Sequence, residues 1–389
     1  MEAIQPPIAA RVALHLRDTA PATVNELSRR LELSRTSVEN AISALIDAGL
    51  VAESPVVTSG GAGRPARQYA FRTDAGVVVG VDIGVTSIRV IVADRGGSVV
   101  SQQTYDGPDS LFDGAARLTA VADGIRAALT TAAIPLSRVR AIGVSLPGIV
   151  DDAGFVTTSV VIPEWSGIDI GAQLRHTFGR PVSVDNGVRL AAVAEHHLGV
   201  AQLVEDVIYL SVGNRIAMGL ILGGQPRRGI HNAAGDIGRL AFRGLRTATG
   251  QILWRTAPTA AEVFALAQTG DAQAQEELDA FIDELSHGIA MLTMTVDPAM
   301  IVIGGGLSEA HEQLLDPLRK ALPRYIDLPF QVPVAGARLG AEAAAHGAVI
   351  HAFQRHSVEI YGVEGMRVPS IIPLPHDKPV RAAEGAARR

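Results

Sequence analysis

The hydrophobic pattern of this chain changes abruptly at Val77. Before that point, apolar residues recur every three or four positions, which is typical of short amphipathic helices. From Val77 onward, short β-rich runs end in turns of Gly, Asp or Asn, which is typical of buried strands in an α/β domain. The chain therefore combines two kinds of structure, and its 389 residues leave room for two or three folding units.

Composition excludes several classes of protein. The chain has no cysteine, which rules out disulfides and thiolate metal sites. Apolar runs are short and the N-terminus lacks a secretion signal, so we expect a cytoplasmic protein with no membrane partner. The net charge of −6 argues against a chain coated in nucleic acid, but it is compatible with one small basic module.

The N-terminal segment predicts three short helices with well-defined ends. An apolar stripe runs along residues 8–18, and Thr23 and Glu26 have the spacing of a capping box. Ser34 is placed to cap a third helix, and Gly49 fits the left-handed turn that closes it. Two short helices joined by a tight turn are the helix-turn-helix pattern, so a winged helix-turn-helix is expected here.

The second helix of this pattern would present polar side chains to double-stranded DNA. Its first turns carry donors and acceptors suited to base edges in the major groove, namely Arg35, Thr36, Ser37, Glu39 and Asn40. Residues 51–72 predict a hairpin, or wing, with Arg64 at its tip and Arg67 nearby, where an extended Arg can enter a narrow minor groove. The alternative is a helical domain for protein contacts. Charge does not decide, because residues 1–72 hold eight Arg against seven Asp or Glu.

The rest of the chain repeats a unit in which a buried strand ends in a small, polar turn. The turns come in the order Asp82-Ile-Gly84-Val-Thr86, Pro147-Gly148 with Asp151, Asp185-Asn186-Gly187, and Gly304 to Gly306. Such turns aim backbone N–H groups at phosphate in several folds. A second, similar set begins at Val207, so we expect an α/β body of two lobes with a ligand-binding cleft between them.

This order of motifs resembles the ROK family of repressors, open reading frames and sugar kinases. The resemblance covers nearly all of residues 8–355, and it includes Pro163-x-Trp165 and the run from Arg228-Gly-x-His231 to Gly235-Asp-Ile-Gly238. It implies an actin-like ATPase fold for the body. The fused winged helix resembles the family's repressor branch, whose members control carbohydrate genes.

The resemblance also implies a division of the chain and a mode of assembly. We expect a winged helix over residues 1–72, a first lobe over 73–191 with 341–362, a second lobe over 192–340, and a disordered tail over 363–389. A homodimer or tetramer of the body would present paired winged helices to a palindromic operator.

Against the family's kinases, the chemistry of phosphoryl transfer is missing. The resemblance places the kinases' general base directly after Asn186, where this chain has Gly187, and a glycine cannot take a proton. Val85 and Ser87 replace Gly and Lys in the first phosphate turn, and Arg215 interrupts the second. We therefore expect no enzyme, no catalytic residue and no cofactor.

The family's zinc and sugar sites are also reduced. Arg239 stands where the family has a zinc-binding histidine, and the cysteines are absent, so we expect no metal. His231 in such a turn is more often hydrogen-bonded structure than a ligand. The candidate effector-binding residues are Asn186, His231, Asp236 and Arg239. Arg239 either closes the site through a salt bridge with Asp236 or binds an acidic or phosphorylated effector.

Three functions are compatible with these residues. The first is a repressor that responds to a sugar or sugar-derived effector through closure of its lobes. The second is a ligand-independent regulator whose body is a scaffold for dimerisation. The third is an active sugar kinase, against which the missing base, the altered phosphate turns and the absent zinc site all weigh. An open cleft would favour the first over the second, and a cleft filled by Arg215 and Arg239 would favour the second.

Overall fold

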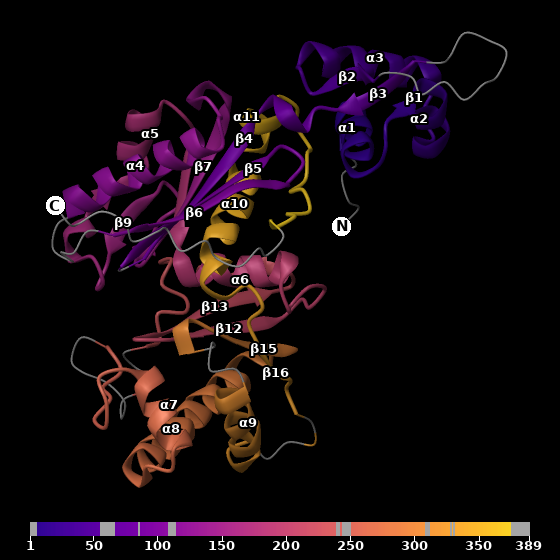
Figure 1. The fold of residues 1–389 in the computed structure, drawn as a ribbon. Coiled ribbons are helices and arrows are strands. Elements are labelled where there is room, and N and C mark those ends of the chain that lie inside the picture. The colour runs from indigo at the N-terminus through magenta and orange to yellow at the C-terminus, as the bar shows by residue number, and fades with distance from the viewer. Residues whose placement is uncertain are drawn as a thin grey trace.

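The computed structural model describes residues 6–54, 67–84, 86–107, 114–238, 242, 250–307, 312–326, 329 and 331–374. They form a small N-terminal domain that lies beside one lobe of a two-lobed body (Figure 1). In this part of the chain, no helix combines the length and the apolar character needed to cross a membrane. The predicted α/β class, with a winged helix before two lobes, is confirmed.

The N-terminal domain is a winged helix built from α1 (Ile8–Asp18), β1 (Ala22–Thr23), α2 (Val24–Leu31), α3 (Arg35–Asp47), β2 (Val51–Ser54) and β3 (Gln68–Phe71). The strands form an antiparallel sheet in the order β1-β3-β2. The predicted capping box is present, because the Glu26 N–H donates to the Thr23 hydroxyl at 3.3 Å and the Thr23 N–H donates to the Glu26 carboxylate at 2.7 Å. Gly49 has a φ of 66°, as the left-handed turn after α3 requires.

The first lobe is a five-stranded sheet covered on both faces. It contains β4 (Val77–Ile83), β5 (Ser87–Asp94), β6 (Val99–Asp106), β7 (Val139–Leu146) and β11 (Val182–Asn186), in the order β11-β7-β4-β5-β6. Helices α4 (Gly114–Thr131) and α5 (Ile170–Phe178) pack on one face, and α10 (Ala343–Arg355) packs on the other. A small separate sheet joins β8 (Ile149–Val150), β9 (Phe155–Thr158) and β10 (Ile168–Asp169).

The second lobe repeats the arrangement of the first. Its strands are β12 (Val207–Val212), β13 (Ile216–Leu222), β14 (Gln225–Pro226), β15 (Met300–Gly304) and β16 (Val334–Gly336), in the order β14-β13-β12-β15-β16. Helices α7 (Ala260–Gln268), α8 (Ala272–Val296) and α9 (Glu312–Ala321) cover the outer face. When the strands of each sheet are numbered in chain order, both sheets have the spatial order 3-2-1-4-5. This shared order confirms the predicted repeat.

Two helices lie between the sheets and bring the lobes together (Figure 1). Helix α6 (Gly187–Leu198) packs on the second sheet, α10 packs on the first, and the two helices pack on each other. Glycine makes these approaches possible. A Cβ at Gly143 on β7 would overlap the Ala348 carbonyl oxygen of α10, and one at Gly347 of α10 would overlap the Leu190 carbonyl of α6. The cleft therefore opens over a tightly packed helix pair.

The segment after α11 (Ser357–Tyr361) differs from the sequence prediction. A disordered tail was expected from residue 363, but for residues 363–374 this is wrong. Met366 and Ile371 are buried, and the Ile372 backbone bonds to the turn before β6, donating to Gly97 O at 3.0 Å. The few apolar side chains of this segment pack against the body, and such packing cannot be predicted from composition alone. Residues 375–389 lie outside the described part of the chain.

Candidate functional site

The first turns of α3 carry most of the side chains predicted to meet DNA. Arg35, Thr36, Glu39 and Asn40 are exposed. Ser37 is half-buried instead, because its N–H and hydroxyl both bond to the Ser34 cap, the N–H at 3.0 Å. Four of these five side chains therefore lie at the surface, and the fifth, Ser37, bonds to the N-terminal cap of the helix.

Arg35 is held in position by two neighbours. Its Nε donates to the Glu39 carboxylate at 2.9 Å, and its Nη1 donates to the Asn25 side-chain oxygen at 3.2 Å. Asn25 lies in the first turn of α2 and was missed by sequence reasoning, because its position beside Arg35 depends on how the two helices pack. A guanidinium fixed in this way loses less rotamer freedom when it binds a planar acceptor.

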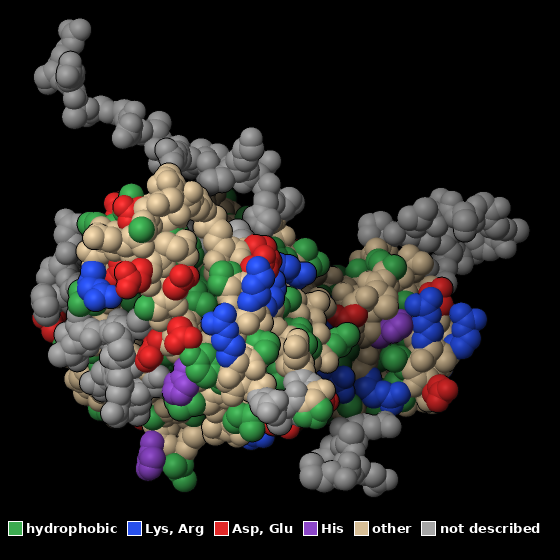
Figure 2. Space-filling model, turned by 90° about the horizontal axis from the view of Figure 1, so that it is seen from below, with side chains coloured by type: hydrophobic (Ala, Val, Ile, Leu, Met, Phe, Trp, Pro, Cys, Tyr) green, Lys and Arg blue, Asp and Glu red, His purple; other side chains and the backbone are tan. Residues whose placement is uncertain are grey.

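The wing is only partly described. Arg67, which directly precedes β3, is exposed, and its Nη1 donates to the carboxylate of Glu53 on β2 at 2.8 Å. Arg64 lies outside the described residues. Figure 2 shows basic side chains on the winged helix, at right in that view, mixed with acidic ones. This agrees with the near-neutral charge of the module.

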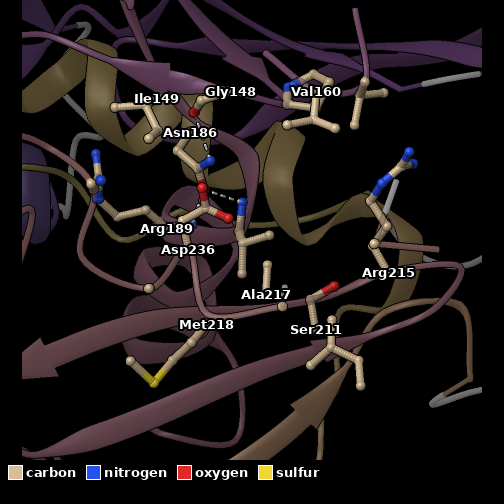
Figure 3. Close-up of a pocket in the computed structure, with 18 of the residues that line it drawn as sticks. Gly148, Ile149, Val160, Asn186, Arg189, Ser211, Arg215, Ala217, Met218 and Asp236 are labelled. Carbon is tan, nitrogen blue, oxygen red and sulfur yellow. Dashed lines mark hydrogen bonds between the residues drawn. The ribbon is translucent and has the colours of Figure 1, made fainter. Parts of the chain in front are cut away.

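The cleft contains two adjoining cavities. The first, of about 210 Å³, lies between the lobes and includes Asn186, Arg215 and Asp236 in its lining (Figure 3). The second, of about 490 Å³, is bounded by the Asp82–Gly84 turn, Gly187 and the glycine turn after β15. Both share Pro147, Val161, Asn186, Val188, Ser211 and Arg215. Between the described residues, the cleft is thus open rather than filled.

Asn186, a predicted effector residue, is largely occupied by the protein itself. Its side-chain oxygen accepts from the N–H groups of Val188 and Arg189 at 3.0 and 3.1 Å, which caps α6. Its amide nitrogen donates to Gly148 O at 2.8 Å. One amide hydrogen is left for a ligand.

The other predicted effector residues are dispersed. Asp236 is exposed and lines the first cavity, as expected. His231 is also exposed, but it is not part of the lining that the described residues give to either cavity. Arg239 lies outside the described residues, so the choice between its two predicted roles stays open.

A group of charges, buried at Asp185 and Arg189 and exposed at Asp152, ties the two lobes together beside the first cavity. Arg228, from the loop after β14, forms ion pairs with Asp152 and, at 3.1 Å, with Asp185 of the first lobe. Asp185 also pairs with Arg189 of α6. Burial raises the pKa of Asp185 to about 6, while the Arg189 charge and the Asn186 N–H act in the opposite direction. We call these four residues the interlobe charge cluster.

A second contact connects the body to the winged helix through Tyr361. This side chain is fully buried, and its hydroxyl donates to Arg95 O at 3.0 Å. Its ring stacks on Phe353 of α10 at 6.1 Å and lies 6.3 Å from Phe71 of β3, measured between ring centroids. Arg17 of α1 reaches the same hydroxyl at 3.4 Å. Helix α10 therefore runs from the cleft to the base of the winged helix.

Comparison with known families accounts for both parts of the chain. A model described as "ROK family" matches residues 78–244 and 240–355, which is more than half of the chain. The chain belongs to the ROK family. A model of the MarR family also matches residues 5–63, the segment that contains the three helices of the winged helix.

Individual ROK relatives include both repressors and kinases. The xylose repressor of Bacillus subtilis is 24% identical over 354 residues, covering 84% of this chain and 90% of that protein. A ROK hexokinase from Thermus thermophilus is 30% identical, with a TM-score of 0.60 over 72% of this chain and 98% of its own. A ROK transcriptional regulator, a homologue of the E. coli MLC protein, shares the fold with a TM-score of 0.70 at 21% identity, over 91% of this chain and 96% of its own.

The sequence resemblance assigns the position of the ROK kinase base to Gly187, and the cavity wall is closely packed there. Gly187 is the first residue of α6, and a Cβ there would lie 2.9 Å from the Ser145 hydroxyl. That hydroxyl donates to Asp82 at 2.6 Å, and Arg89 lies 3.7 Å from the same carboxylate. Burial raises the pKa of Asp82. Any side chain at this position would therefore require the Ser145 hydroxyl or the start of α6 to shift.

The zinc site of ROK proteins does not fit this chain. There is no cysteine in the sequence, and within the described ranges no three His, Asp or Glu side chains gather where they could hold a metal. The glycine turn after β15 also has a structural role, because a Cβ at Gly304 would overlap the hydroxyl of Tyr209. Gly305 has a φ of 84°, which favours glycine, whereas a Cβ at Gly306 would meet no atom within 4 Å, so packing accounts for the first two glycines of the turn and not for the third.

Proposed function

We propose that this ROK-family protein is a cytoplasmic, DNA-binding transcriptional repressor of carbohydrate-related genes, and that its pseudokinase body binds an effector. One observation carries the proposal. A helix-turn-helix with exposed polar side chains on α3 is fused to a kinase-like cleft that has glycine at the position of the base. The xylose repressor relative, which spans both parts of the chain, supports the same combination.

The DNA interface consists of α3 and the wing. Arg35, Thr36, Glu39 and Asn40 read base edges, Ser37 fixes the start of α3, and Arg64 and Arg67 contact the minor groove or its phosphates. Asn25 orients Arg35. Two copies of the chain, in a homodimer or tetramer, place two such helices on a palindromic operator.

The body works without phosphoryl transfer. Gly187 offers no group to accept the proton of a sugar hydroxyl, and Ser145 and Asp82 occupy the space around it. Loss of a general base typically costs about 10²–10⁴-fold in rate. The division at residues 72/73, 191/192 and 340/341 separates the DNA-binding part from two lobes that close on a ligand.

An effector in the cleft acts through the contacts between lobes. Closure changes the interlobe charge cluster, and α10 carries the change to Tyr361, where Phe71 and Arg17 of the winged helix make contact. Such a ligand shifts DNA binding only if its affinity differs between the two arrangements. Between the described residues the cleft is open, which supports an effector over a ligand-independent scaffold.

Footprinting on the DNA upstream of carbohydrate genes tests the proposal. The purified full-length chain should protect two related half-sites, spaced by whole turns of the helix. Protection of a single unrepeated half-site would contradict the paired arrangement. Turnover of ATP with a sugar panel, above background in a coupled ADP-release assay, would contradict the non-catalytic body.

A further inference from the structure

Arg215 lies at the centre of the cleft and is a cation for which the described residues supply no ion-pair partner. It lies between β12 and β13, and its side chain lines both cavities. Its Nε is buried and has no hydrogen-bond partner. Burial lowers the pKa of this guanidinium, but it remains charged at neutral pH. A partly desolvated charge of this kind is costly unless something pairs with it.

The other arginines that line the two cavities differ from Arg215 in this respect. Arg89 lies 3.7 Å from the Asp82 carboxylate, and Arg189 pairs with Asp185. Among the residues whose structure is described, no carboxylate forms an ion pair with Arg215. The guanidinium of Arg215 is therefore a positive charge in the cavities that no described side chain neutralises.

The remaining lining indicates the size and polarity of what would lie next to this charge. Apolar side chains make up much of the first cavity, including Ile149, Val160, Val161, Ile216 and Met218. Figure 3 shows Arg215 and Asp236 on opposite sides of the cavity. A ligand that spans it would meet a cation at one end and a hydrogen-bond acceptor at the other, with an apolar surface between them.

We propose that the cleft binds a small anionic carbohydrate derivative, a sugar acid or sugar phosphate, with its anionic group on Arg215 and a hydroxyl group on Asp236. This inference rests on the proposed function, since it names the effector class of the same cleft. The guanidinium binds carboxylate and phosphate through the same charge-assisted hydrogen bonds, and the Ser211 hydroxyl beside it lines both cavities. Neutral sugars lack the group that neutralises Arg215.

Thermal unfolding and calorimetric titration of the full-length protein test the inference. The probes are glucose, gluconate and glucose 6-phosphate, the matched xylose series, and inorganic phosphate, all at one ionic strength. We expect at least one anionic probe to raise the unfolding midpoint while its neutral parent does not. A shift with gluconate or xylonate alone indicates a carboxylate, and a shift with the phosphates alone indicates a phosphoryl group.

Matched variants assign the effect to Arg215. Arg215→Gln should weaken binding of the anionic probe by about 10- to 100-fold, the factor carried by one hydrogen bond to a charged group. Arg227→Gln, at an exposed arginine that lines neither cavity, should leave it unchanged. Without ligand, Arg215→Gln should unfold at a midpoint equal to or above that of the unmodified protein, because it removes an unpaired charge.

Several results would overturn the inference. These are equal binding of neutral and anionic probes, anion binding that survives in Arg215→Gln, no shift with any probe, or a lower midpoint for ligand-free Arg215→Gln. Operator binding, measured separately by fluorescence anisotropy, reports on the proposed function. Loss of the anion effect with intact operator binding refutes only the ligand class, whereas absence of operator binding refutes the regulator itself.

Discussion

The winged helix and the cleft use their polar side chains in opposite ways. On α3, Thr36 and Asn40 are exposed, and Arg35 is aligned by neighbours without being buried. In the cleft, Asp82 accepts from the Ser145 hydroxyl, and Asn186 donates to Gly148 O and caps α6, so both are bonded within the protein. Arg215 is the exception, because no described carboxylate pairs with it. Polar side chains thus remain at the surface in one region, whereas the other bonds two of its polar side chains internally and leaves one charge unpaired.

The largest expected effect concerns the contact that joins the two regions. Tyr361→Ala removes a fully buried ring that stacks on Phe353 and contacts Phe71, so we expect it to destabilise the protein by about 3–5 kcal/mol. Tyr361→Phe keeps the ring and loses the hydroxyl, with its bond to Arg95 O and the longer bond from Arg17, which should cost about 1 kcal/mol. Urea unfolding measures both. Equal midpoints for Tyr361→Ala and the unmodified protein would show that the two regions are not joined here.

The next effect isolates the winged helix. Arg35→Ala should weaken operator binding by about 10- to 100-fold, as expected for a side chain that bonds to a base edge, with little change in stability. Fluorescence anisotropy with a labelled operator measures the affinity. Arg126→Ala is the control, because Arg126 is an exposed helical arginine on α4 that pairs with nearby Asp123. If both variants bind alike, α3 does not read the operator through Arg35.

The two regions also differ in how well the sequence predicts them. The capping box at Thr23 and the turn at Gly49 could be predicted because their hydrogen bonds join residues within a few positions. The repeated fold followed from the order of strands and turns. The ion pair of Arg228 with Asp152 could not be predicted in this way, since 76 residues separate the partners and only packing of the lobes brings them together.

Asn186 shows the limit most clearly. The resemblance identified it as a sugar-binding residue, and it does line the cavity, but its oxygen caps α6. Asn186 before Gly187 is also a typical start of a helix, but the resemblance to the ROK motif favoured a role in sugar binding. Residues 363–374 show the reverse case, in which composition suggested disorder and a few buried apolar side chains decided otherwise.

A smaller effect concerns the acid stability of the body. Burial and the charges of Arg228, Arg355, His356 and Arg189 lower the pKa of His351 on α10 to about 3. An unfolded chain protonates this group near its ordinary value of 6.5, so stability from His351 is present above pH 6.5 and is lost as pH falls toward 3. Asp185 acts in the opposite sense between 3.8 and about 6, because its pKa is raised.

A variant separates these two contributions. His351→Gln should flatten the decline in unfolding free energy between pH 6.5 and 5 relative to the unmodified protein, measured by urea titration at each pH. His231→Gln, at an exposed histidine of the second lobe, is the control variant. Identical profiles for His351→Gln and the unmodified protein would show that His351 does not stay neutral in the folded body.

The smallest effect is expected for a variant that restores a carboxylate at the position of the missing base. Gly187→Asp puts a carboxylate at the position of the kinase base, yet its Cβ meets the Ser145 hydroxyl at 2.9 Å and lies 3.8 Å from the Asp82 carboxylate. The new charge would compete with Asp82, and Arg215 still interrupts the second phosphate turn. We therefore expect no ADP release above background with any sugar of the panel. Gly187→Ala measures the steric cost alone, so the difference in stability between the two variants reports the charge. Turnover by Gly187→Asp, and not by Gly187→Ala, would mean that the cleft lacks only its base, and the contrast with the winged helix would then rest on a single residue.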